Sequence, residues 1–314
     1  MSKKLNCFFL ALFILSGCKS SKNNNETIPR AADSLKVLSW NVWHAGHSKE
    51  YPQKGCNATK KILKKSNADI IIMIETYGCS NSIADYLGYY HRLLSDNLSI
   101  YSRYPIVRTL PFPDIISPYN FGGVELNVHG KTVRVFNTWL HYLPDIRLAP
   151  LDKPETEILT WDDAGSRDDE IKTIMQILQP FIAESDSIPI ILGGDFNVHS
   201  HLDWTEATKN LYNHRGKCIN WTVSQIMQKH GFIDSFREIN PDPVKTLGPT
   251  WFWSDGGIKK RMDRIDFIYY LRKNIHAIRS NSYNADLGGS FQFCGEEYLY
   301  PSDHGFVSTT FKIH

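Results

Sequence analysis

The chain has 314 residues, of which 42% are hydrophobic and 22% charged, with 35 Lys and Arg against 33 Asp and Glu. This composition excludes a disordered or fibrous protein, and the length suits one large domain or two small ones. A formal charge of +2 argues against a protein that holds duplex nucleic acid by bulk electrostatics, because such domains are usually strongly basic.

Residues 1–17 are expected to be an export signal. Lys3 and Lys4 form a positive start, and the apolar run from Leu5 to Leu15 has signal-peptide length and is too short to span a bilayer. The run ends in Leu-Ser-Gly-Cys18, which resembles the bacterial lipobox, where the cysteine is lipidated and becomes the first residue. An ordinary cleaved signal with a chance cysteine is the alternative.

Residues 18–34 are expected to be a lipidated Cys18 and a flexible tether. One acyl chain anchors a protein only marginally, so stable attachment requires several on this cysteine. We therefore predict a lipid-anchored protein of the bacterial cell envelope, on the periplasmic or surface side. Residues 1–17 hold two lysines and no acid, so without them the basic count equals the acidic count of 33.

The cysteines outside this leader fit an exported protein. No Cys-x-x-Cys spacing occurs, so a zinc cluster is not expected. Two disulfides in an oxidising compartment and four buried thiols are both consistent with the sequence, which does not choose among the three pairings. The cysteines in question are Cys56, Cys79, Cys218 and Cys294.

The first part of the folded region predicts two strands around a helix. Residues 35–40 alternate as a strand does and end at Asn41, and a helix over 58–65 follows with its lysines outward. Residues 69–74 form a continuous apolar strand of the kind buried on both faces, and this strand stops at Glu75.

The same order recurs later in the chain. A strand over 132–140 ends at His141, and a helix from residue 170 to about 184 is opened by the capping-box spacing of residues 166–169. An apolar strand over 188–194 then ends at Asp195.

Two further strands close the chain. Residues 264–270 carry Asp266 in an otherwise apolar run, and residues 305–313 follow Asp303 and His304 directly. No change of composition marks a linker, so residues 35–314 are predicted to be one domain. Polar groups just beyond strand ends are the pattern expected of an α/β active site.

Polar side chains thus collect at the ends of apolar strands. Each taken alone commonly starts a turn by bonding its own backbone. Together they offer carboxylate and amide oxygens, which suit Mg²⁺ or Mn²⁺ rather than zinc, and histidines that transfer protons near neutral pH. The chain has no Gly-x-Ser-x-Gly elbow and no P-loop. The set is Asn41, Glu75, His141, Asp195, Asn197, Asp266, Asp303 and His304.

These residues resemble, in chain order, the motifs of the endonuclease/exonuclease/phosphatase superfamily. That resemblance implies an α/β four-layer sandwich of two packed β-sheets flanked by helices, the DNase-like fold, over residues 35–314. The motifs are Ser39-Trp-Asn41-Val, Ile74-Glu75-Thr, Tyr101-Ser-Arg-Tyr-Pro-Ile106, Asn137-Thr-Trp-Leu-His141, Gly194-Asp195-Phe-Asn197, Arg264-Ile-Asp266-Phe-Ile and Ser302-Asp303-His304.

The resemblance implies a metal centre and a proton-transfer pair. Glu75 would be the principal ligand of Mg²⁺ or Mn²⁺, with Asn41 beside it and Asp303 nearby. Asp266 would pair with His304 and fix its tautomer, so that His304 acts as the base on water.

The remaining site residues would handle the substrate. Asp195 and Asn197 would orient the nucleophilic water, hold the scissile phosphate or bind a second cation, and His141 would donate to a phosphate oxygen or assist the leaving group. Basic residues are also expected to bind substrate, namely Arg103, Lys259, Lys260 and Arg261.

Two departures from the superfamily pattern affect single roles. Many members have Gln before the metal-binding Glu, whereas this chain has Ile74. The strand-end histidine often follows Thr directly, but here Trp139 and Leu140 precede His141. Since Trp139 and His141 would point to the same side of a strand, a local bulge or turn must decide which of them reaches the site.

We therefore predict divalent-metal-dependent hydrolysis of phosphoester bonds by a monomer. A small phosphoester or single-stranded nucleic acid is the preferred substrate, because a balanced net charge disfavours duplex binding. A secreted-type endonuclease or exonuclease acting on DNA or RNA is one alternative, and a catalytically silent binding lipoprotein is another. The sequence leaves open the substrate, the choice between monoester and diester, and the number of metal ions. Tryptophans beside the motifs, such as Trp43 and Trp139, have the chemistry to stack on a base, although core packing is their usual role.

Overall fold

The computed structural model describes residues 33–46, 55–112, 115–117, 119–254 and 260–314, without the side chains of 253–254 and 260–261. The predicted signal peptide, Cys18 and the tether to residue 32 lie outside the described residues. Within the described ranges, no helix combines the length and apolarity needed to cross a membrane.

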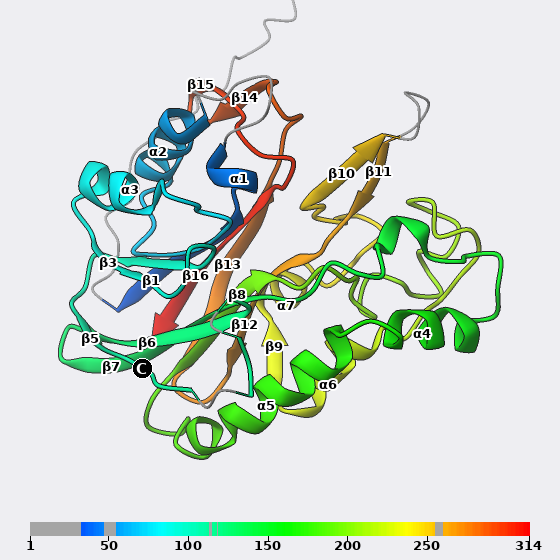
Figure 1. The fold of residues 1–314 in the computed structure, drawn as a ribbon, viewed down its shortest axis with the longest axis horizontal. Helices are drawn as coiled ribbons and strands as arrows, with labels where there is room; N and C mark the ends of the chain where they lie inside the picture. Colours follow the sequence, from blue (N-terminus) through cyan, green and yellow to red (C-terminus); the bar gives the residue numbers. More distant parts are fainter. Residues whose placement is uncertain (1–32, 47–54, 113–114, 118, 255–259) are drawn as a thin grey trace, which may run out of the picture.

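Two six-stranded mixed sheets form the centre of the molecule (Figure 1). The first has the order β13-β16-β1-β2-β4-β3 and the second the order β5-β6-β7-β8-β12-β9. The strands of the first are β1 (Ser34–Asn41), β2 (Ile70–Ile74), β3 (Tyr90–Leu93), β4 (Ser99–Ser102), β13 (Ile275–Tyr283) and β16 (Phe306–Ile313). Those of the second are β5 (Ile106–Thr109), β6 (Phe121–Val128), β7 (Lys131–Trp139), β8 (Ile190–Asp195), β9 (Phe232–Asp234) and β12 (Asp266–Leu271).

Helices cover the outer face of each sheet, which completes the four predicted layers. Figure 1 shows α2 and α3 on one side of the two sheets and α5 and α6 on the other. The helices are α1 (Trp43–Gly46), α2 (Gly55–Ser66), α3 (Ser80–Leu87), α4 (Glu155–Asp163), α5 (Arg167–Ala183), α6 (Thr222–Lys229), α7 (Ser235–Ile239) and the 3₁₀ turn η1 (Ile146–Leu148). Two small hairpins complete the description: β10 (Trp251–Ser254) with β11 (Lys260–Asp263), and β14 (Ser290–Phe293) with β15 (Glu296–Leu299).

The apolar strand β2 shows why the sheets are buried on both faces. Ile70 and Ile72 pack in the core between the two sheets, while Ile71 and Met73 pack against α2 and α3 on the outer face. Successive side chains of a strand point to opposite faces, so a continuous apolar run packs into a hydrophobic core on each face of the sheet. The prediction of a strand buried on both faces is confirmed.

The registers bring several strand ends to one end of the molecule. β1 runs parallel to β2, and β7 runs parallel to β8. Trp40 of β1 faces Phe306 of antiparallel β16, and Asp195 of β8 faces Asp266 of antiparallel β12. The two sheets are joined there by Asn137, whose Nδ2 donates to the carbonyls of Met73 (2.8 Å) and Ser99 (3.2 Å).

The structure corrects one capping detail. Helix α5 begins at Arg167, three residues before the predicted start at residue 170, and the Ser166 side chain makes no capping bond to the helix backbone. Its hydroxyl instead donates to Glu170 Oε1 at 3.2 Å, and Glu170 Oε2 accepts the backbone N–H of His141. Glu170 thus links the start of α5 to the segment that follows β7, and the predicted capping box of residues 166–169 is not formed.

The cysteines follow neither of the two expected patterns. Cys56 at the start of α2 and Cys79 before α3 form a disulfide, whereas Cys218 and Cys294 are exposed thiols. The bridge closes a local loop of sequence separation 23. It ties α2 to the segment that follows Glu75, a proximity that periodicity alone does not reveal.

Candidate active site

Polar residues from both sheets converge where the strand ends meet. Asn41 ends β1, Glu75 follows β2, Asp195 ends β8, Asp266 begins β12 and His304 precedes β16. All five are buried, with at most 7% of each residue accessible to solvent. Ionisable groups are this deeply buried only when they are paired or bind cations, so the cluster is a candidate active site.

Asn41 links two of the carboxylates. Its Nδ2 donates to Glu75 Oε1 at 3.1 Å and to Asp195 Oδ2 at 3.0 Å, and its Oδ1 accepts the backbone N–H of Trp43 at 2.9 Å. The amide presents its nitrogen to the carboxylates in this structure, and the role of Asn41 as a metal ligand stays a prediction. Asn41 holds Glu75 and Asp195 at a fixed separation.

The Glu75 carboxylate is also held by an unusual backbone turn. Trp43, His44 and Ala45 all have positive φ (43°, 50° and 61°), and the His44 N–H donates to Glu75 Oε2 at 2.9 Å. Glu75 itself has a φ of 60°. Non-glycine residues in this region each cost about 1–3 kcal/mol and gather at functional sites. Gly46, which follows the turn, also has a positive φ, and glycine adopts it without cost. The residue types of Trp43, His44 and Ala45 do not predict this turn.

Asp266 and His304 form the predicted pair. His304 Nδ1 lies 2.9 Å from Asp266 Oδ2, and His304 Nε2 lies 4.0 Å from both Asp195 Oδ2 and Asp303 Oδ1. A carboxylate at Nδ1 favours the tautomer with its proton on that nitrogen, which leaves Nε2 as the acceptor. The free nitrogen therefore faces the other carboxylates.

The charges of this cluster are strongly coupled. Burial disfavours the imidazolium, but Asp266 and Asp195 outweigh it and hold the pKa of His304 well above its ordinary value. Burial, and then the charge of Asp266, raise the pKa of Asp195 to about 7. Loss of hydration also raises the pKa of Asp303, although 31% of its side chain is accessible. The carboxylates are thus crowded together around His304, and a divalent cation bound among them would lower the pKa of His304 and let Nε2 act as the proton acceptor.

The donor set suits a hard divalent cation. Oxygen or nitrogen atoms of Asp195, Asp266 and His304 lie within 4.8 Å of one another. Asp266 Oδ1 and Asp303 Oδ1 are buried without a hydrogen-bond partner among the described residues. His304 Nδ1 is committed to Asp266, so the carboxylates are the better ligands, and carboxylate oxygens are what Mg²⁺ and Mn²⁺ prefer. The chemistry of these donors therefore fits Mg²⁺ or Mn²⁺, while Glu75, the predicted principal ligand, is not one of the three grouped residues and its role stays a prediction.

Asn197 stands beside Asp195 in a fixed orientation. Its N–H donates to Asp195 Oδ1 at 2.8 Å, its Nδ2 donates to the Leu140 carbonyl at 2.8 Å, and its φ is 51°. Its own carbonyl accepts from Arg167 Nη1 at 2.8 Å. Arg167 is buried at the start of α5 and ion-paired with Asp162, a supporting role that sequence reasoning missed.

The end of β7 distinguishes Trp139 from His141. Trp139 is the last residue of the strand and stands in register with Asp195 of the parallel strand β8. His141 lies beyond the strand, where its N–H donates to Glu170 and its Nδ1 accepts from the Leu143 N–H at 3.2 Å. The strand therefore carries Trp139, not His141, alongside Asp195, and the role of His141 stays a prediction.

Arg103 is not brought to the cluster, and its predicted role in substrate binding stays a prediction. It lies next to Ala68 and Asp69, at the end of β2 opposite to Glu75. Its Nε is 3.4 Å from Asp69 Oδ1 and its guanidinium lies over the Tyr89 ring at 5.2 Å. Arg103 therefore has a structural role here. Strand β4 runs antiparallel to β2 and ends beside the start of β2, away from Glu75.

The other predicted basic residues stay predictions. Lys259 lies outside the described residues, and Lys260 and Arg261 are placed on β11 by their backbone alone. Arg147 was not predicted from the sequence to lie near the site. Its guanidinium lies 5.7 Å from the Trp251 ring, and Trp251 forms a β-bridge with His304. Its hydrogen bonds to Asp145, and the charges of Asp145 and Asp303, raise the pKa of Arg147.

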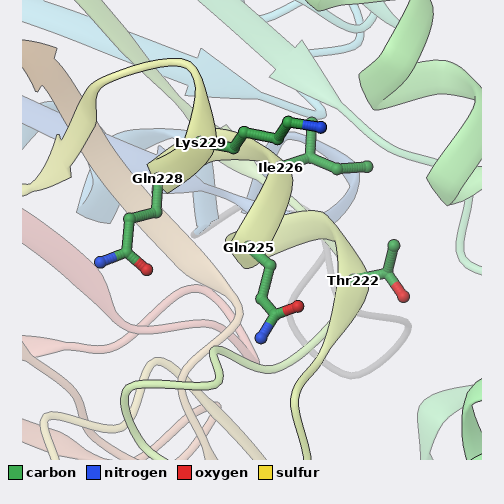
Figure 2. Close-up of a pocket in the computed structure, with 5 residues that line it drawn as sticks. All are labelled: Thr222, Gln225, Ile226, Gln228 and Lys229. Atoms are coloured by element: carbon green, nitrogen blue, oxygen red, sulfur yellow. The ribbon is translucent and has the colours of Figure 1, made fainter.

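A surface hollow elsewhere on the molecule does not belong to this site. Figure 2 shows it along α6, with polar side chains and one isoleucine around it. None of the predicted site residues lines it. The lining residues are Thr222, Gln225, Ile226, Gln228 and Lys229.

A model of the endonuclease/exonuclease/phosphatase family matches residues 38–304, which is most of the chain and includes every residue of the cluster. The chain belongs to that family. Members of the family are hydrolases that act on phosphoester bonds. The predicted DNase-like fold is confirmed by the two mixed sheets and by the solved structures that share it.

Several proteins are similar to this family member. The uncharacterised protein F14F9.5 of Caenorhabditis elegans is 27% identical over 260 residues, which is 76% of this chain and 79% of that protein. The crystal structure of TDP2 from C. elegans has a TM-score of 0.59 at 17% identity, over 89% of this chain and 75% of that one. A structure of D. rerio TDP2 complexed with single-strand DNA product has a TM-score of 0.54 at 15% identity, over 89% and 99%.

Proposed function

We propose that this protein hydrolyses phosphoester bonds with a divalent metal ion, and that a small phosphoester or single-stranded nucleic acid is its substrate. The observation that carries the proposal is the buried Asp266–His304 pair, whose free nitrogen faces Asp195 and Asp303. A base held in one tautomer next to carboxylate ligands is what metal-assisted hydrolysis requires.

The residues of the site have separate roles in the proposed reaction. Asp266 Oδ2 keeps the proton on His304 Nδ1, so His304 Nε2 accepts the proton of the attacking water. Glu75, Asp195 and Asp303 would hold Mg²⁺ or Mn²⁺, which when bound supplies positive charge against the charge that grows on the phosphate oxygens. Asn197, fixed by its three hydrogen bonds, orients the phosphate or the water at Asp195.

Two observations support the substrate class. The balance of acidic and basic residues after residue 17 disfavours a duplex, because binding one normally brings a Lys or Arg to each contacted phosphate. The fold neighbour D. rerio TDP2 was solved with a single-strand DNA product. A secreted-type nuclease acting on DNA or RNA remains the alternative within the same chemistry.

The activity is tested with purified full-length protein and bis-p-nitrophenyl phosphate. We expect turnover with Mg²⁺ or Mn²⁺ that EDTA abolishes. His304→Gln and Glu75→Gln should each lower kcat at least about 100-fold. The control is His230→Gln, since His230 contacts Gln179 on the surface and should leave kcat unchanged.

A panel of substrates then separates the alternatives. It should contain plasmid DNA, RNA, single-stranded DNA, nucleotide monophosphates and inositol phosphates, each with added metal. Preference for single strands or small esters supports the proposal, whereas efficient cutting of plasmid DNA favours the nuclease. A protein inert on the whole panel would refute the proposed hydrolysis and favour the catalytically silent binding lipoprotein.

We also propose that residues 1–17 are an export signal and that a lipid on Cys18 anchors residues 35–314 outside the cytoplasm. The Cys56–Cys79 disulfide supports this, because disulfides persist in oxidising compartments. In a bacterial host, Cys18→Ser should move the protein from the membrane fraction to the soluble extracytoplasmic fraction. Cys294→Ser, which changes an exposed thiol, is the control. Retention of the Cys18→Ser protein in the membrane would overturn the anchor.

A further inference from the structure

Aromatic rings from separate segments line one side of the candidate active site. The series begins at His44, whose N–H donates to Glu75, and ends at Trp139, which stands in register with Asp195. We call His44, Tyr77, Tyr119 and Trp139 the aromatic arc. It runs from one carboxylate of the site to the other.

The rings of the arc contact one another in sequence. The rings of His44 and Tyr77 stack with centroids 5.7 Å apart and an interplanar angle of 24°. The Tyr77 and Tyr119 hydroxyls lie 2.7 Å apart, and the Tyr119 and Trp139 ring centroids are 5.7 Å apart. Each link is within the usual range of an aromatic pair or a hydrogen bond, so the arc is one connected surface.

The arc is accessible rather than part of the core. The His44 side chain is 62% exposed and Tyr119 is 37% exposed, while Tyr77 and Trp139 are partly buried. Connected aromatic surface that stays exposed is uncommon on a soluble protein and marks a binding region. Core packing, the default role of such residues, therefore does not account for His44 and Tyr119.

The backbone is strained where the arc is built. His44 lies in the left-handed turn of Trp43–Ala45, and Tyr77 has a φ of 21°. Such conformations persist only where the surrounding structure enforces them. The same turn places the His44 ring against Tyr77 and its N–H on Glu75, so the strain positions the arc relative to the catalytic carboxylates.

We propose that the aromatic arc is a subsite that stacks a nucleobase attached to the phosphate being hydrolysed. This inference rests on the proposed phosphoester chemistry and names its substrate class. Flat rings with polar edges suit a planar, polar-edged partner, and base–aromatic stacking tolerates every base because each has a π-face. A lipid chain would instead need an aliphatic groove, which the imidazole and the tyrosine hydroxyls do not form.

Direct binding tests the arc without requiring turnover. Thymidine 5′-monophosphate and deoxyribose 5-phosphate differ only in the base, and their Kd values are measured by calorimetry on the full-length protein with Mg²⁺. We expect the nucleotide to bind about tenfold more tightly, the low end of what stacking on a base contributes. Tyr119→Ala should remove most of this difference, and Tyr119→Phe should retain it because the ring remains.

The control variant is Tyr86→Ala. Tyr86 is a tyrosine of similar exposure (46%) on α3 whose ring contacts Lys60, outside the arc. It should leave both Kd values unchanged. Trp139→Ala is a second arc variant, and its thermal unfolding should be recorded to confirm that it folds.

Each outcome bears on one proposal. Equal affinity for the two ligands in the unaltered protein, or a base preference that survives both Tyr119→Ala and Trp139→Ala, overturns the arc. Phenyl phosphate binding as tightly as the nucleotide would show a general aryl site and overturn the nucleobase assignment. A base preference without hydrolysis would leave the arc standing and refute the proposed function, whereas hydrolysis without a base preference would refute the arc alone.

Discussion

Asp203 neutralises two buried guanidinium groups at once, and replacing it should destabilise the protein severely. Its Oδ1 lies 2.5 Å from Arg237 Nη2 and its Oδ2 lies 2.8 Å from Arg264 Nη2. Arg264 is also 2.5 Å from Asp234, and the Arg264 side chain is fully buried. Asp203→Ala leaves two cations in the interior with one carboxylate between them.

The magnitude follows from this geometry. Removing one partner of a buried ion pair costs about 3–5 kcal/mol, because the remaining charge stays desolvated. Since Asp203 serves two arginines, we expect the upper part of that range, about 4–5 kcal/mol, partly relieved because Arg237 also donates to the carbonyls of Asn240 and Thr246. For a domain of this size the loss corresponds to a Tm lower by about 10 °C or more.

The same network supports the active site. Arg264 lies two residues before Asp266, and Asp203 lies in the loop that follows Asn197. The ion pairs therefore tie together two segments that carry site residues, and kcat should fall in the variant even below its Tm. Asn at this position keeps some hydrogen bonds and should be intermediate.

Thermal and urea unfolding followed by circular dichroism measure the effect. Glu206→Ala is the matched control, because Glu206 is 75% exposed and pairs with Lys209 on the surface, a type of pair worth less than about 1 kcal/mol. If Asp203→Ala unfolds within about 1 kcal/mol of the unaltered protein, the guanidinium groups are not desolvated in solution and the reasoning is refuted.

Three further changes test the site and its surroundings. Asp266→Asn should lower kcat by about 10²–10⁴-fold, because an amide no longer fixes the tautomer of His304; a decrease under tenfold in steady-state assays would contradict the pair. Replacing Cys56 and Cys79 by Ala should cost about 3 kcal/mol in urea unfolding, and the unaltered protein in dithiothreitol should match the variant. Burial, and then the charge of Asp162, raise the pKa of Asp168 to about 7, so the folded state binds this proton more tightly than the unfolded state and loses stability as the pH rises from about 4 to 7. Asp168→Asn should therefore be the more stable protein at pH 8, by at most about 4 kcal/mol, with no difference below pH 4; a constant difference at both pH values would reject the shift.

Six strands and the polar residues at their ends were predictable because they depend on local patterns, whereas the shorter or less regular strands such as β3 and β13 were not predicted. The apolar run of β2 stops at Glu75, and the run of β8 stops at Asp195, as the periodicity indicates. The pairing of Asp266 with His304 followed from the family resemblance and is present.

The sequence is least informative where an outcome depends on partners distant in the sequence. Arg103 follows β4, and because β4 pairs antiparallel with β2, Arg103 lies beside the start of β2 and away from Glu75. The orientation of the Asn41 amide is set by Trp43 and by two carboxylates from other segments.

The sequence by itself determined six of the strands, the polar residues at their ends and the family, because periodicity and motifs are properties of neighbouring residues; the order of the strands in the two sheets came from the structure. Only the tertiary structure decided which of these residues meet. Registers between strands, the left-handed turn at His44 and the disulfide at Cys79 place side chains that are far apart along the chain. The aromatic arc is the clearest case, since its rings come from separate segments and are joined only by contacts through space.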